Sequence, residues 1–146
     1  TRRGYRVMTV KHGHGFDLDT EGTDSWRHRH EGGARRVVMA SPDGFAVVGA
    51  WPEETPAGPA ELARRYLHDA DIVLVEGFKH EPLPKIEVYR SSAHAEPVFP
   101  PGAPEWQHYL AMATDAAGFE APFPVLDVED PELPARLADL VEAELL

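Results

Sequence analysis

Apolar runs of strand length alternate with helical patterns along this chain. Five runs bounded by Gly, Pro or charged residues predict strands, at residues 5–10, 71–75, 85–90, 108–113 and 123–128. Apolar positions at helical spacing predict helices at 59–70, beginning at Pro59, and at 131–146. Strands that alternate with helices indicate an α/β domain with a mostly parallel sheet flanked by helices.

Two further patterns predict a β-hairpin insertion and a short helix. The runs 35–40 and 45–51 are rich in β-formers and are separated by Ser41-Pro42-Asp43-Gly44, a strong turn signal. Thr23-Asp24-Ser25 offers good N-cap residues, so residues 26–31 predict a helix that ends at Gly32-Gly33. Because no interior linker or repeat is visible, we expect residues 1–146 to form a single domain.

Composition narrows the class of protein. The chain has 146 residues, is 42% hydrophobic and carries a net charge of −11, which argues against a nucleic-acid partner. It contains no cysteine, which excludes disulfides, Cys-based zinc sites and thiol nucleophiles. No apolar run approaches the roughly 20 residues that span a bilayer, and no signal peptide opens the chain. We therefore expect a cytoplasmic protein with no membrane partner.

The strongest chemical signal is the string Val73-Leu74-Val75-Glu76-Gly77-Phe78-Lys79-His80-Glu81-Pro82. A buried strand delivers the Glu76 carboxylate to its tip, and Gly77 allows a close backbone approach. Lys79 adds positive charge at the same corner. This layout is typical of a phosphate-and-metal site at the carboxyl edge of a parallel sheet, although a core strand that ends in an ordinary turn would read similarly.

A second cluster begins at the end of the first predicted strand. Lys11 is followed by a loop rich in glycine that carries Asp17 and Asp19. These residues suit a phosphate and its Mg²⁺, which takes one or two carboxylates together with waters and phosphate oxygens. Either aspartate could bind the metal or orient an attacking water; the alternative is a solvated acidic loop.

Two other patterns carry candidate chemistry. His12 with His14, and His28 with His30, form His-x-His pairs that could bind a transition metal, although exposed histidines without a ligand are the more common state. Thr114-Asp115 ends the strand predicted at 108–113, where the carboxylate could accept hydrogen bonds from guanine. A turn or helix cap explains Thr114-Asp115 equally well.

Together these segments resemble the molybdopterin-guanine dinucleotide biosynthesis adapter family, MobB. The resemblance runs from Tyr5 to the C-terminal helix. The string around Glu76 is its most specific part, whereas the Thr-Asp motif is not specific. The matching text is Val10-Lys11-His12, Asp17-x-Asp19, Asp24-Ser25, Leu74 to Glu81, Pro84-Lys85-Ile86 and Thr114-Asp115.

The resemblance implies a fold like that of P-loop NTPases and a function as an accessory protein. It implies GTP binding with Mg²⁺, a homodimer, and association with the guanylyltransferase MobA. The implied nucleotide-binding residues are Lys11, Glu76, Gly77, Lys79, Thr114 and Asp115. Glu76 and Asp17 are the implied Mg²⁺ ligands, and Asp17 and Asp19 the candidate catalytic residues. Hydrolysis of GTP is expected to be weak at most.

One departure from the family pattern leaves alternatives open. The family begins with a strand and a Walker A loop, G-x-x-x-x-G-K-[ST], and no such pattern occurs in these 146 residues. We therefore expect about 30 further residues upstream, the size of a strand–loop–helix unit. One alternative is a nucleotide-free scaffold that acts through the hairpin; another is a metal-delivery protein that uses the histidine pairs.

Overall fold

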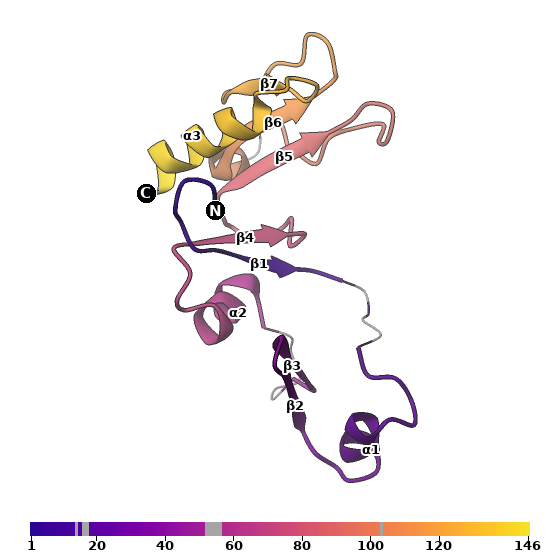
Figure 1. The fold of residues 1–146 in the computed structure, drawn as a ribbon. Helices are drawn as coiled ribbons and strands as arrows, with labels where there is room; N and C mark the ends of the chain where they lie inside the picture. Colours follow the sequence, from indigo (N-terminus) through magenta and orange to yellow (C-terminus); the bar gives the residue numbers. More distant parts are fainter. Residues whose placement is uncertain (14, 16–17, 52–56, 103) are drawn as a thin grey trace. The chain divides into compact units, whose positions relative to one another are not determined.

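The computed structural model describes residues 1–13, 15, 18–51, 57–102 and 104–146 (Figure 1). The chain divides into two compact units, residues 1–78 and 79–146, and each is described by itself.

Two parallel strands form the centre of the first unit. Strand β1 (Val7–Lys11) pairs with β4 (Ile72–Glu76) in a register that places Lys11 opposite Glu76. Helix α2 (Pro59–Tyr66) begins with Pro59, whose fixed φ suits the first helical position, and packs against β1. This register therefore places Lys11 and Glu76 together at the carboxyl edge of the strand pair.

An ion pair fixes the amino end of this strand pair. The Arg6 guanidinium donates to both carboxylate oxygens of Asp71, at 2.8 and 3.2 Å, and the Arg6 backbone N–H donates to the same carboxylate at 2.7 Å. These hydrogen bonds lower the pKa of Asp71 to about 2. The pair joins residues that precede each strand directly, so it supports the observed register.

The first unit also contains the hairpin and the short helix. Strands β2 (Arg36–Ser41) and β3 (Gly44–Gly49) are antiparallel and pair Ser41 with Gly44 across the turn. Helix α1 (Asp24–His30) packs against β2, and the Thr23 hydroxyl accepts from the Trp26 N–H as its N-cap.

The second unit is a three-stranded parallel sheet with an aromatic core. Its strands are β5 (Lys85–Tyr89), β6 (Tyr109–Thr114) and β7 (Val125–Asp127), with β6 in the middle. A 3₁₀ helix η1 (Pro104–His108) precedes β6, and helix α3 (Leu133–Leu145) ends the unit. The buried cluster consists of Tyr89, Phe99, Tyr109 and Met112, with Trp106, Ala116, Phe119, Ala121 and Phe123 packed against it.

The predicted mixture of parallel strands and a β-hairpin is confirmed. The predicted strands and helices occur at the expected places, with ends that differ by a few residues, and helix α2 stops at Tyr66 rather than at residue 70. The 3₁₀ helix η1 includes His108, the first residue of the strand predicted at 108–113, so this strand begins one residue later, at Tyr109. The single-domain arrangement stays a prediction.

Replacement of Asp71 tests the ion pair. Because the pKa of Asp71 in the folded protein lies below its usual 3.8, its stabilising effect is complete above that value and is lost as the pH falls through about 2. Asp71→Asn should therefore lower the urea midpoint at neutral pH, and the difference from wild type should shrink in strong acid. Asp43→Asn, which removes an equal charge from the β2–β3 turn, is the control; equal pH dependence of both variants would contradict the assignment.

Candidate functional site

Lys11 and Glu76 meet at the carboxyl edge of the β1–β4 pair. Lys11 Nζ lies 2.5 Å from Glu76 Oε1, and the side chains are 60% and 71% exposed. The His12 N–H donates to the Glu76 carbonyl at 2.9 Å, which extends the pairing by one residue. The structure therefore brings together two residues, 65 positions apart, that were predicted to share a site.

A strained turn follows Glu76 directly. Gly77 has φ of +84°, and a Cβ at this position would lie 2.7 Å from the Cβ of His12, so only glycine fits without a shift. Phe78 also has positive φ, +48°, which is uncommon outside glycine and disfavours an L-residue by about 1–2 kcal/mol. The ring of Phe78 lies 4.8 Å from that of His12. Strain of this kind concentrates at ligand-binding sites.

Of the two predicted aspartates in the glycine-rich loop, the structure describes only Asp19. Asp17 lies outside the described residues. Asp19 is nearly buried, and its Oδ2 accepts from the Arg29 guanidinium at 2.6 Å, with His30 Nε2 3.9 Å away. Its second oxygen, Oδ1, is buried and has no hydrogen-bond partner among the residues that the structure describes. Asp19 therefore anchors helix α1 to the loop, and its catalytic role stays a prediction.

Thr114 and Asp115 end β6 in the second unit. The Thr114 hydroxyl accepts from the Ala116 N–H at 3.0 Å, and Asp115 Oδ1 accepts from the Ser91 N–H at 2.8 Å. The Ser91 hydrogen bond is the largest influence that lowers the pKa of Asp115. Asp115 is an exposed carboxylate at the carboxyl edge, whereas Thr114 is buried and caps the turn. A guanine contact by either residue stays a prediction.

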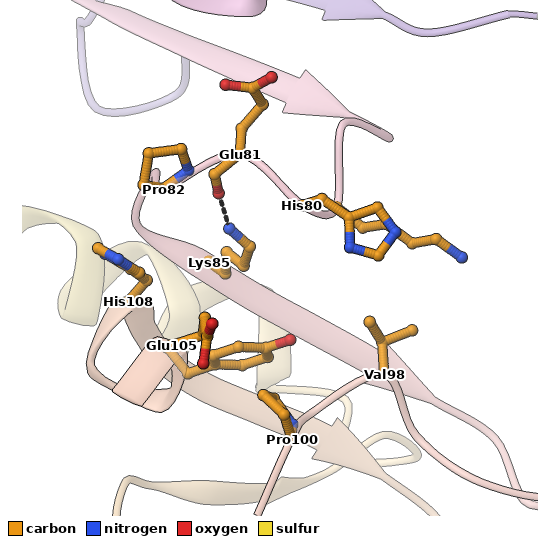
Figure 2. Close-up of a pocket in the computed structure, with 10 residues that line it drawn as sticks. His80, Glu81, Pro82, Lys85, Val98, Pro100, Glu105 and His108 are labelled. Atoms are coloured by element: carbon orange, nitrogen blue, oxygen red, sulfur yellow. Dashed lines mark hydrogen bonds between the residues drawn. The ribbon is translucent and has the colours of Figure 1, made fainter. Parts of the chain in front are cut away.

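Lys79 lies in the second unit, where it lines a cavity of about 370 Å³ (Figure 2). This cavity contains functional groups that the sequence patterns did not single out, chief among them Lys85. Burial lowers the pKa of the Lys85 ammonium, against an opposing influence of Glu81. In the sequence Lys85 stands at the start of an alternating strand and within the family-like segment Pro84-Lys85-Ile86, and neither pattern indicates that its side chain is half-buried.

The metal-delivery alternative for the histidine pairs stays a prediction. No group of three or more His, Asp or Glu side chains placed to hold a metal occurs within the parts of the chain described above. His30 stacks on Trp26 with ring centroids 4.7 Å apart, and His28 is exposed. His14 lies outside the described residues.

These observations define a mixed α/β protein with parallel strands, a β-hairpin and a lysine–carboxylate pair at a sheet edge. A family model described as "Molybdopterin guanine dinucleotide synthesis protein B" matches residues 1–115. The chain belongs to this family, MobB, which confirms the resemblance drawn from the sequence.

Individual relatives agree with the family match. The chain is 36% identical over 143 residues to the molybdopterin-guanine dinucleotide biosynthesis adapter protein of Haemophilus influenzae, covering 96% of this chain and 73% of that protein. It is 35% identical over 144 residues to the protein of the same name from Escherichia coli, covering 95% and 76%.

Solved structures share the fold. A crystal structure of molybdopterin-guanine biosynthesis protein B aligns with a TM-score of 0.67 and 25% identity, covering 99% of this chain and 84% of that one. Bacillus subtilis MobB aligns with a TM-score of 0.60 and 14% identity, covering 95% and 80%. Among the described residues, none of the helices combines the length and apolar character that a membrane span requires.

Substitution of Gly77 tests the strained turn. Gly118→Ala should lose about 1–2 kcal/mol of unfolding free energy, because Gly118 has φ of +73° but open space around it. Gly77→Ala should lose more, because its new Cβ also meets His12. Chemical denaturation measures both. In a His12→Gly background, which lacks the His12 Cβ, Gly77→Ala should cost less unfolding free energy than it does in the wild-type background. Equal losses for the two alanine variants would show that the His12 contact is unimportant.

Proposed function

We propose that this protein is a GTP-binding adapter in molybdopterin guanine dinucleotide biosynthesis that assists a MobA-type molybdopterin guanylyltransferase. Membership of the MobB family and the printed names of two relatives support the pathway. The observation that carries GTP binding is the Lys11–Glu76 pair, held at the carboxyl edge of parallel strands beside a strained glycine turn. Nucleotides bind at this edge of α/β sheets.

The exposure of the pair makes it suitable for exchanging partners. An exposed ion pair contributes only about 0–1 kcal/mol, so a ligand separates it with little loss. In the proposed complex Lys11 turns to a phosphate of GTP, and Glu76 holds Mg²⁺ directly or through water, with Asp17 as a second candidate ligand. Gly77 lets the backbone approach the phosphates, and Lys79 adds positive charge.

The remaining proposed roles concern the base and the chemistry. Thr114 and Asp115 are the proposed guanine contacts, with the exposed Asp115 carboxylate accepting from the guanine N1–H and amino group. We propose slow hydrolysis at most, because the Arg29 guanidinium holds one oxygen of Asp19 and limits its use as a base. An adapter needs GTP to be bound and released rather than turned over quickly.

Replacement of Glu76 tests the nucleotide site. Glu76→Gln should weaken binding of GTP with Mg²⁺ about tenfold, the size expected for one charge-assisted contact, and Lys11→Met should do the same. Titration calorimetry with GTP and with ATP measures both affinity and base preference. Glu129→Gln is a matched control. The Glu129 side chain is 66% exposed, and its Oε1 lies 2.5 Å from Arg90 Nη1, so it forms an exposed ion pair like that of Glu76.

The scaffold alternative predicts a different result from the same measurement. If the protein fails to bind GTP at millimolar concentration with Mg²⁺ while it still associates with the guanylyltransferase, GTP binding is excluded and the scaffold reading holds. An adapter that binds GTP but does not associate with the transferase would contradict the proposed partner instead.

We further propose a homodimer that forms through the β2–β3 hairpin. Val38 pairs with Val47, and Ala40 with Phe45, so these side chains share one face of the hairpin. Val38 is 65% exposed, Phe45 is 79% exposed and Val47 is 46% exposed. A contiguous exposed apolar face marks a protein interface more often than a solvated surface.

A charge on this face should disrupt the dimer. Val47→Glu buries a carboxylate in the proposed interface, which should shift the protein toward the monomer in sedimentation or light-scattering measurements. Val98→Glu in the second unit is the control, since Val47 and Val98 are both 46% exposed. A wild-type protein that is monomeric at high micromolar concentration would refute the proposal.

A further inference from the structure

The cavity in the second unit lies at the amino ends of two parallel strands. Lys85 is the first residue of β5, Tyr109 is the first residue of β6, and the two are partners in the sheet register. Thr114 and Asp115 lie at the opposite end of β6. A strand rises about 3.3 Å per residue, so the cavity is separated from the proposed guanine contacts by the length of the strand.

Lys85 is a half-buried cation held by backbone carbonyls. Its ammonium donates to the carbonyl oxygens of Glu81 and Leu83, the latter at 3.4 Å, while the Glu81 carboxylate acts on it only as a nearby charge. Figure 2 shows the Glu81 carboxylate directed away from Lys85, while its carbonyl oxygen accepts the hydrogen bond. An ammonium that is partly desolvated and held by carbonyl dipoles keeps a positive charge that an anionic ligand can approach.

Other ionisable groups also line the cavity. Lys79, His80 and His108 also line it, whereas the two lining carboxylates are Glu81, which is directed away, and Glu105. Glu87, the next inward-facing residue of β5, accepts from the N–H groups of Val98 and Phe99 at 2.6 and 2.9 Å and is thereby occupied. The lining thus brings two lysines together with two carboxylates, of which that of Glu81 is directed away from Lys85.

The walls of the cavity are apolar and aromatic. Pro82, Val98, Pro100 and Tyr109 line it, and burial raises the pKa of Tyr109, so its hydroxyl stays protonated as a hydrogen-bond donor. A concave site of this size with apolar walls and a few convergent polar groups is typical of small-molecule binding. The cations are lysines without an arginine, which suits a phosphoryl group better than the planar, bidentate recognition of a carboxylate.

We propose that this cavity binds the phosphoryl group of a small phosphorylated molecule, with Lys85 as the principal anion contact and the Tyr109–Pro100 wall against its flat apolar part. This is a second anion site, distinct from the Lys11–Glu76 edge. It does not depend on GTP binding, and the cavity lies in the second unit, whereas the Lys11–Glu76 pair lies in the first.

Three small probes test the proposal by NMR titration of the backbone amides. Phenyl phosphate should bind most tightly, inorganic phosphate more weakly because it lacks the apolar part, and benzoate most weakly because it lacks the phosphoryl group. Shifts should concentrate at residues 79–85 and 105–109. Benzoate binding as tight as phenyl phosphate would overturn the phosphoryl assignment, and the absence of shifts in these segments would overturn the site.

Substitutions assign the binding to Lys85. Lys85→Met should weaken phenyl phosphate binding at least about tenfold, whereas Arg136→Met, which removes an equal charge from helix α3 of the same unit, should leave it unchanged. Glu105→Gln should strengthen binding, and this opposite direction provides a test even if Lys85→Met fails to fold. Loss of binding in Lys11→Met instead of Lys85→Met would place the anion at the proposed nucleotide site and refute a second site.

Discussion

The parallel pairing of β1 with β4 is the constraint on which the first unit depends. It joins segments 65 residues apart, and each end of the ladder carries an ion pair across the two strands: Arg6 with Asp71 and Lys11 with Glu76. A slip of one residue would break both pairs and turn the apolar side chains to the other face. The register therefore determines whether a lysine and a carboxylate meet at the carboxyl edge.

The two ion pairs serve different purposes because their surroundings differ. Asp71 accepts three hydrogen bonds from Arg6, including one from the backbone, which fixes its geometry. The Lys11–Glu76 pair has one close contact and both side chains are largely exposed, so it can open for a ligand. The strained Gly77-Phe78 turn lies directly after the second pair, where backbone distortion would serve binding rather than stability.

The core of the second unit is built around β6. The residues of β6 are mostly buried, and Met112 packs in a cluster with Tyr89, Phe99 and Tyr109. Lys85 begins the neighbouring strand β5 and is the sheet partner of Tyr109, and Asp115 follows β6 at its carboxyl end. Tyr109 therefore belongs to the core and also lines the cavity with Lys85.

Much of the fold could be predicted from periodicity and turn chemistry. The run before Glu76, the Pro-Asp-Gly turn and Pro59 each correspond to an observed element. Helix η1 could not be predicted in this way, because its residues lack a repeating apolar pattern. The ion pair of Asp19 with Arg29 could not be predicted either, because it depends on how helix α1 packs against the loop. These features arise from tertiary contacts that leave no local signal.

The sequence by itself determined the family, the alternation of strands and helices, and the residue types at the Glu76 edge, because these depend on local order along the chain. Only the tertiary structure decided that Lys11 faces Glu76, that Thr114 is occupied as a turn cap, and that Lys85 is a half-buried cation held by backbone carbonyls. Each of these depends on burial and on strand register, which bring together residues that are distant in the sequence.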